Sequence, residues 1–137
     1  MRKYTLIIVE DDEDEQLFMK EGFEKANVPF DIISQVQNGD QLLNWLDEHP
    51  DKLPDIILSD LNMPGRNGYD VIIAIKENPE WSHIPVIITS TSSTKTIIDK
   101  CLALGAADYV VKPDTFINYV PYVESLYQAI EEKQLIK

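Results

Sequence analysis

Cysteine, histidine and positive charge are all scarce in this sequence. It has one cysteine, Cys101, and two histidines among 137 residues. A single cysteine excludes an intramolecular disulfide and a cysteine-ligated metal cluster. Lysine and arginine number 12 against 24 aspartates and glutamates, so the formal net charge is -12. So acidic a chain is poorly suited to bind nucleic acid or an anionic membrane surface, because both attract basic patches.

Long hydrophobic runs are also missing. No apolar run approaches the roughly 20 residues of a membrane-spanning helix, and the first apolar stretch is too short for a signal-peptide core. We therefore expect a cytoplasmic protein. The hydrophobic content of 44% and charged content of 26% are ordinary for a globular chain. We expect residues 1–137 to form one domain with no output domain.

Short apolar runs alternate with helical patterns along the whole sequence. The runs are continuously hydrophobic, which is typical of strands covered on both faces of a parallel sheet. The predicted strands are Tyr4–Val9, Phe30–Val36, 55–59, 85–89 and Asp108–Val111. Apolar residues at helical spacing predict helices around 18–26, 42–46, 71–75, 97–104 and 116–130. This order predicts an α/β fold: a doubly wound, five-stranded parallel sheet with five helices on its two faces.

The last predicted helix, which begins with Phe116 in its apolar pattern, contains a proline. Pro121 lacks a backbone donor, so it is poorly tolerated inside a helix. Either the helix begins near Tyr119, with Pro121 in its first turn, or it is kinked at Pro121. The sequence leaves both alternatives open.

One aspartate stands at the end of the third apolar run. Asp60 follows Ile56 to Ser59, and Pro64 and Gly65 then stop the strand. In a parallel α/β sheet the carboxyl ends of the strands share one edge, where ligands bind. A carboxylate there is accessible and is held by a rigid element. We therefore predict that Asp60 is the reacting group.

Other polar residues follow the neighbouring strands at the same edge. Glu10, Asp11 and Asp12 follow the first strand, Ser90 the fourth and Lys112 the fifth. Because crowded carboxylates repel each other, a hard divalent cation such as Mg²⁺ is the natural compensation. Asp60 would then attack a phosphoryl group and become an aspartyl phosphate, with the cation and Lys112 offsetting the charge on the transferred oxygens.

Taken together and in order, these pieces resemble the receiver domains of two-component response regulators. The matching segments are residues 9–12, 60–65, 85–91 and 108–113, and the resemblance covers essentially the whole chain. It is similar to the stand-alone, CheY-like and phytochrome-associated members of that family. The resemblance implies the strand order 2-1-3-4-5.

The resemblance also implies a role for each residue at the edge. Asp60 would be the phosphoacceptor, Asp11 a direct Mg²⁺ ligand, and Glu10 an acid that acts mainly through water. Asn62 would offer its backbone carbonyl to the metal. Lys112 would bind the phosphoryl group.

Two residues are expected to act as a switch. Ser90 lies 30 residues after Asp60 and 22 before Lys112, which is the family's spacing for the switch hydroxyl. Thr89 is the alternative, one position early on the strand itself. Tyr109 stands where the family has an aromatic ring that turns inward on activation; the alternative is an ordinary half-exposed strand residue.

Several other residues are expected to have ordinary roles. Asp14 and Glu15 are predicted to lie on a solvated helix face. Trp45 and Trp81 are predicted to pack in the protein rather than to stack on a ligand.

The resemblance implies a function in signalling. The protein would accept a phosphoryl group from a phosphohistidine on a histidine kinase or phosphotransfer protein, and would signal to a downstream protein target through a changed surface, or act as a relay or phosphate sink. The changed surface would be formed by segments 85–89, 97–104, 108–111 and 116–130. The last three offer a face for a homodimer. No enzymatic turnover is expected beyond slow self-dephosphorylation.

Two other functions fit parts of the sequence. A Mg²⁺-dependent phosphohydrolase of the haloacid dehalogenase type also uses a strand-end aspartate, but it needs a general acid two residues later, where this chain has Asn62. A flavodoxin-like binding module needs a phosphate-cradling loop after the first strand. Here the acids Glu10, Asp11 and Asp12 would repel a flavin phosphate.

Overall fold

Five parallel strands form one sheet in the order β2-β1-β3-β4-β5. The computed structural model describes residues 3–113 and 118–136. The strands are β1 (Tyr4–Val9), β2 (Phe30–Val36), β3 (Ile56–Asp60), β4 (Val86–Ser90) and β5 (Asp108–Val111). The predicted fold class and strand order are confirmed.

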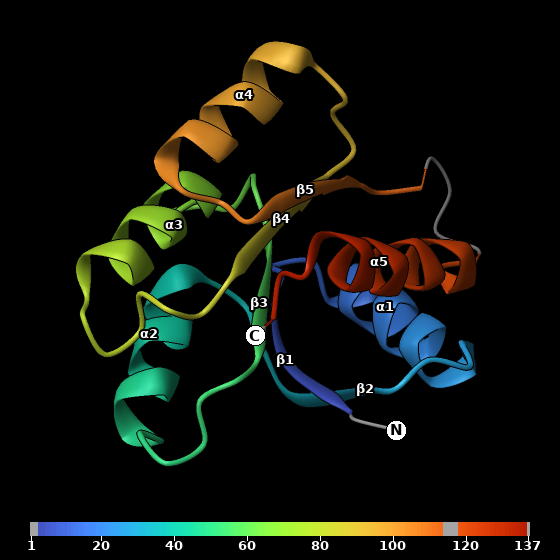
Figure 1. The fold of residues 1–137 in the computed structure, drawn as a ribbon, viewed down its shortest axis with the longest axis horizontal. Coiled ribbons are helices and arrows are strands. Elements are labelled where there is room, and N and C mark those ends of the chain that lie inside the picture. The colour runs from blue at the N-terminus through green and yellow to red at the C-terminus, as the bar shows by residue number, and fades with distance from the viewer. Residues whose placement is uncertain (1–2, 114–117, 137) are drawn as a thin grey trace.

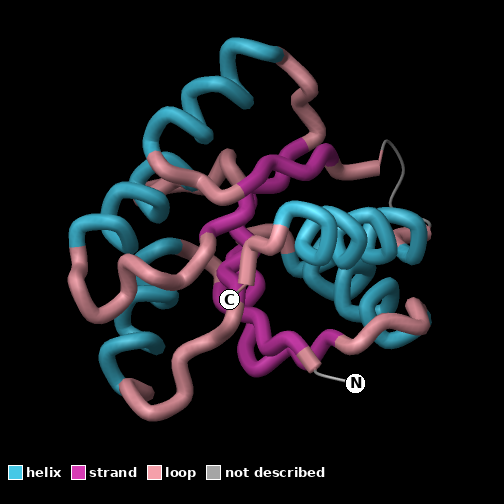
Figure 2. The backbone as a smooth tube through the Cα atoms, in the orientation of Figure 1, coloured by secondary structure: helices cyan, strands magenta, loops and turns pink. Residues whose placement is uncertain are grey.

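A helix follows each strand, and the helices form two layers. They are α1 (Glu13–Lys25), α2 (Gly39–Glu48), α3 (Gly68–Glu77), α4 (Lys95–Leu104) and α5 (Val120–Lys133). Helices α1 and α5 cover one face of the sheet, and α2, α3 and α4 cover the other (Figure 1, Figure 2). Within the described part of the chain, no helix combines the length and apolar character needed to cross a membrane.

The central strands are apolar along their whole length because both faces are covered. In β1, Ile7 and Val9 pack into the core on the side of α2, α3 and α4, whereas Leu6 and Ile8 pack against α1 and α5. Successive side chains of a strand point to opposite faces, so a strand between two helical layers needs apolar residues at every position. This is the physical reason for the continuous hydrophobic runs.

Two strands end later than predicted. Asp60 and Ser90 are the last residues of β3 and β4 rather than the residues that follow them. The backbone ladder continues past the apolar run, because Asp60 pairs with Thr89, and Lys112 N donates to Ser90 O at 2.8 Å. Both side chains are therefore carried by ordered strand backbone.

The last helix begins at Val120, with Tyr119 as its N-cap residue and Pro121 in its first turn. A proline is well tolerated there because the first backbone N–H groups of a helix have no intrahelical acceptor. The structure thus selects the first of the two predicted alternatives. Phe116, which was also assigned to this helix, lies outside the described residues.

Candidate functional site

The carboxyl ends of three strands bring distant residues together at one edge of the sheet. Glu10 follows β1, Asp60 ends β3 and Lys112 follows β5. The Nζ atom of Lys112 lies 2.7 Å from Glu10 Oε1 and 2.9 Å from Asp60 Oδ1. All three residues are buried. The order of the strands, with β1 next to β3, is what places groups so far apart in the sequence within hydrogen-bonding distance.

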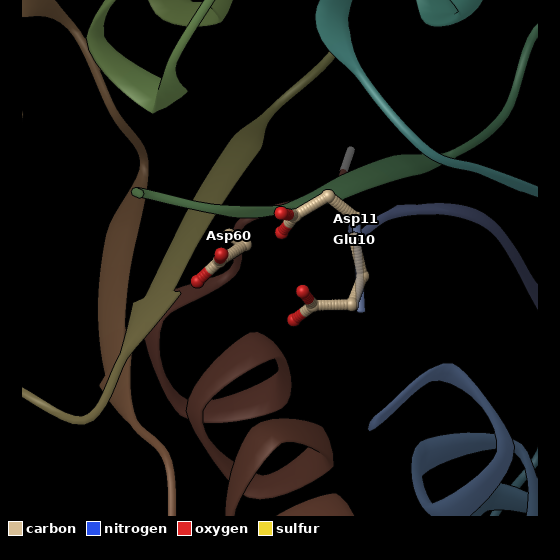
Figure 3. Close-up of side chains that lie close together, drawn as sticks. All are labelled: Glu10, Asp11 and Asp60. Atoms are coloured by element: carbon tan, nitrogen blue, oxygen red, sulfur yellow. The ribbon is translucent and has the colours of Figure 1, made fainter. Parts of the chain in front are cut away.

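Three carboxylates meet at this edge, as Figure 3 shows. One carboxylate oxygen each from Glu10, Asp11 and Asp60 lies within 4.8 Å of the others. Asp11 is exposed, whereas Glu10 and Asp60 are buried, so the cluster is open to solvent on one side. Clustered carboxylate oxygens with room for water are the donor set that suits a hard divalent cation such as Mg²⁺. The three carboxylates fit the Mg²⁺ site that the resemblance in the sequence implies.

The neighbouring acid, Asp12, has a different use. Its side chain accepts a hydrogen bond from the backbone N–H of Glu15 at 3.0 Å and so caps α1. Its own N–H donates to Glu10 Oε2 at 3.2 Å. This turn holds the side chain of Glu10 and connects β1 directly to the helix. Asp12 is therefore a capping residue, and it lies outside the cluster of three carboxylates.

Burial dominates the electrostatics of the carboxylates. It raises the pKa of Glu10 to about 8 from its ordinary value of 4.5, although Lys112 acts in the opposite direction. Burial also raises the pKa of Asp60, again against the effect of Lys112. Removing a charged carboxylate from water is costly, and one ammonium does not fully compensate for several acids. A bound cation would favour the ionised form of both groups.

Lys112 remains charged in spite of its burial. Burial alone would lower the pKa of this ammonium, but Asp60 and Glu10 raise it overall above its ordinary value. Its side chain is only 4% exposed. A buried ammonium next to Asp60 is well placed to stabilise negative charge that develops on a group attached to Asp60.

The prediction that Glu15 lies on a solvated helix face is wrong. Glu15 is buried, and its Oε1 lies 3.1 Å from Lys112 Nζ and accepts a hydrogen bond of 2.8 Å from the hydroxyl of Tyr119. The neighbouring Asp14 is exposed, as expected. Glu15 precedes the buried Met19 by four residues, so both lie on the same side of α1. That spacing is the signal in the sequence that identifies Glu15 as an inward-facing residue.

The two candidate switch hydroxyls have different partners. Ser90 Oγ, at the end of β4, accepts a hydrogen bond of 3.2 Å from the backbone N–H of Ser92. Thr89 Oγ1 donates to Val110 O at 2.8 Å and accepts from Tyr122 at 2.7 Å, which joins it to β5 and α5. Ser90 is thus bonded to the loop that follows β4, whereas Thr89 is bonded into the packed interior.

Tyr109 connects β5 to that same loop. Its side chain is half-buried against the core on the side of α2, α3 and α4, and its hydroxyl donates to Ser92 O at 2.7 Å. Ser90 and Tyr109 therefore both bond to the backbone of Ser92. Asn62 is exposed in the loop after β3. The role of its carbonyl as a metal ligand stays a prediction. Trp81 is buried in the core on the side of α2, α3 and α4, and the partly buried Trp45 packs against the same core.

Comparison with known proteins gives a family match over most of the chain. Residues 6–120 match the family model of the response regulator receiver domain. The chain is 36% identical over 86 residues to the two-component response regulator ORR12 of Oryza sativa subsp. japonica, a match that covers 63% of this chain and 69% of that protein. It is also 37% identical over 109 residues to a probable cyclic di-GMP phosphodiesterase of Vibrio cholerae, but this match covers only 23% of that protein.

Solved structures with the same architecture include two from light-signalling systems. The phosphorylated cyanobacterial phytochrome response regulator RcpA has a TM-score of 0.80 and 25% identity, with 93% of this chain and 94% of that chain covered. The response regulator RPA3017 in red light signaling of R. palustris has a TM-score of 0.80 and 29% identity, with 92% of each chain covered. The haloacid dehalogenase alternative finds no support in these comparisons.

Proposed function

This chain belongs to the response regulator receiver domain family, and from that premise we propose that Asp60 accepts a phosphoryl group from a phosphohistidine donor. The observation that carries the proposal is the placement of Asp60 at the end of β3, with Lys112 at 2.9 Å and two further carboxylates within 4.8 Å. The donor is a histidine kinase or a phosphotransfer protein.

The chemistry follows from the groups around Asp60. A carboxylate oxygen of Asp60 attacks phosphorus while the bond from phosphorus to the donor imidazole nitrogen breaks, and the imidazole leaves with that electron pair. Lys112 offsets the charge on the transferred oxygens. Burial raises the pKa of Asp60, and the positive charge of Lys112 acts in the opposite direction, toward the ionised form that attacks.

The acidic cluster is the proposed Mg²⁺ site. Asp11 and Asp60 would hold the ion directly, with Glu10 acting through water and Asn62 contributing its backbone carbonyl. When bound, Mg²⁺ supplies charge neutralisation on the phosphoryl oxygens. The same neutralisation relieves the repulsion between the clustered acids.

The proposed output runs through the loop after β4. Once a phosphoryl group is attached to Asp60, the Ser90 hydroxyl donates a hydrogen bond to it, and this contact favours a different position of the loop. Tyr109 is tied to that loop through Ser92 O, so its ring moves with the loop. The change then reaches the face formed by α4, β5 and α5.

Exposed apolar side chains support this face as the contact surface for a protein target or for a second copy of the chain. Leu102 of α4 and Val111 of β5 are 44% and 40% exposed. The protein acts in this proposal as a phosphoacceptor with slow self-dephosphorylation rather than as an enzyme. A cytoplasmic location belongs to the same proposal and agrees with the free, buried thiol of Cys101.

Phosphorylation with a small donor tests the proposal. Wild-type protein incubated with acetyl phosphate and Mg²⁺ is expected to gain one hydroxylamine-labile phosphoryl group, detected by intact-protein mass spectrometry. Asp60→Asn removes the acceptor and should gain none. Asp47→Asn makes the same change at an exposed position of α2 and should behave as the wild type. Labelling that persists in Asp60→Asn, or steady turnover of small phosphate esters, would contradict the proposal.

A further inference from the structure

Lys112 has a third acidic neighbour that the proposed chemistry does not use. Besides Glu10 and Asp60, the carboxylate of Glu15 lies 3.1 Å from its Nζ atom. Glu15 comes from the first turn of α1, whereas Asp60 is the last residue of β3. The ammonium is thus shared between the site of phosphorylation and a buried acid of the neighbouring helix.

Glu15 is held in place by the start of α5. The hydroxyl of Tyr119, a residue only 2% exposed, donates to Glu15 Oε1 at 2.8 Å. Burial raises the pKa of Tyr119, so the phenol remains a donor. Gly22 makes room for this tyrosine, because a Cβ atom at Gly22 would lie 2.4 Å from the Cβ of Tyr119. The contact therefore depends on a complementary surface between two helices.

This arrangement matters because an ammonium has three N–H groups and one charge to share. A phosphoryl group on Asp60 adds negatively charged oxygens that need the same cation. Because Tyr119 fixes the carboxylate of Glu15, the ion pair between Glu15 and Lys112 persists. The carboxylate also repels the negative charge added by the phosphoryl group. Without Glu15, Lys112 would keep Glu10 and Asp60 as acidic partners and could turn further toward the phosphoryl group.

We propose that Glu15, anchored by Tyr119, is a positioning residue that competes with the phosphoryl group for Lys112 and so weakens the phosphorylated state relative to the free state. The inference rests on the proposed function, because it assumes that the phosphoryl group is carried by Asp60. The contact between Glu15 of α1 and Tyr119 at the start of α5 would thus directly influence the stability of the phosphorylated state.

Glu15→Gln is the variant that isolates the charge. Glutamine has the same size as glutamate, and its amide oxygen still accepts the Tyr119 hydrogen bond. It carries no negative charge, so it does not compete as an anion for Lys112. Glu13→Gln is the matched control, because it makes the same substitution at an exposed position of the same helical turn. Glu15→Met, which keeps the volume without charge or hydrogen bond, is a second variant in case the first fails to fold.

The probe is beryllium trifluoride, an anion that binds aspartate carboxylates as a phosphoryl mimic, measured by fluorine NMR and calorimetry at saturating Mg²⁺. Glu15→Gln is expected to bind the mimic about tenfold more tightly than the wild type, since one charge-assisted contact no longer competes. Glu15→Met should change in the same direction. Glu13→Gln should stay within about twofold of the wild type, as exposed charges contribute little.

Mg²⁺ affinity, measured without the mimic, separates positioning from general loosening of the structure. Loss of a nearby negative charge is expected to weaken Mg²⁺ binding in Glu15→Gln while the mimic binds more tightly. Weakening of both would show a merely structural role and would overturn the inference, as would unchanged affinity for the mimic. Failure of the wild type to bind the mimic would instead refute the proposed function itself.

Discussion

Tyr122 of α5 donates a hydrogen bond of 2.7 Å to the hydroxyl of Thr89, which in turn donates to Val110 O at 2.8 Å. Burial raises the pKa of Tyr122, so it remains a donor. The chain of bonds joins α5, β4 and β5 directly behind the candidate site. It engages the hydroxyl of Thr89 as both donor and acceptor, and leaves the next residue, Ser90, as the candidate switch.

Thr89→Val should therefore act on stability. The substitution keeps the shape of the side chain but leaves the buried Tyr122 hydroxyl without its acceptor, at a cost of about 1–3 kcal/mol in the free energy of unfolding. Urea unfolding followed by circular dichroism measures this cost. The double variant with Tyr122→Phe should recover part of it, because no buried donor then remains unpaired. A Thr89→Val protein as stable as the wild type would contradict the assigned structural role.

Ser90→Ala should act on signalling instead. Asp60 keeps its neighbours, so labelling by acetyl phosphate is expected to persist in this variant. The chemical-shift changes that accompany phosphorylation in the 91–94 loop and at Tyr109 should be largely lost, because the hydroxyl that draws the loop toward the phosphoryl group is missing. Two-dimensional NMR of the protein with and without beryllium trifluoride provides the measurement. Full-sized changes in Ser90→Ala would exclude it as the switch.

Lys112→Met should destabilise the protein most strongly in the absence of divalent cations. It leaves Glu10, Glu15 and Asp60 buried without their shared counter-charge, and breaking a buried ion pair from one side costs about 3–5 kcal/mol. Added Mg²⁺ should restore part of this loss by neutralising the same acids.

Lys95→Met serves as the control for that measurement. Lys95 forms an exposed pair with Asp99 at 3.3 Å, and its loss should cost about 0.5 kcal/mol or less. Urea unfolding of both variants, with and without Mg²⁺, gives the comparison. Equal costs at the two positions would argue against a charge-balancing role for Lys112.

The pKa of Glu10 predicts how stability depends on pH without divalent cations. Because this pKa is raised from 4.5 to about 8 in the folded protein, the folded state binds the proton more tightly than the unfolded state. The contribution of Glu10 to the free energy of unfolding is present in full below pH 4.5 and is lost as the pH rises through about 8. Thermal unfolding across this range should show a fall that Glu10→Gln removes.

Metal binding should depend on pH in the opposite sense. A proton on Glu10 or Asp60 opposes a cation at the acidic cluster, so Mg²⁺ affinity should rise with pH up to about 8. Calorimetric titrations at several pH values test this. A Mg²⁺ affinity independent of pH over that range would contradict the assignment of Glu10 to the site.

Local patterns in the sequence predict much of the architecture. Continuous apolar runs such as Tyr4–Val9 identify strands covered on both faces, and the alternation of strands with helices leads to the parallel sheet. A strand-end acid such as Asp60 can be placed at the sheet edge because parallel strands share that edge. These inferences need only the spacing of residues along the chain.

Other features were decided by the tertiary structure. The sequence left two starts open for the last helix, and the structure places Pro121 in its first turn. The burial of Glu15 depends on Tyr119, 104 positions away, and the charge network depends on Lys112, 102 positions from Glu10. Whether an acid at a helix start is solvated or covered is set by the element that packs over it. The spacing from Glu15 to Met19 indicates the inward face of α1, but the partners of Glu15 on that face, Lys112 and Tyr119, depend on the tertiary structure.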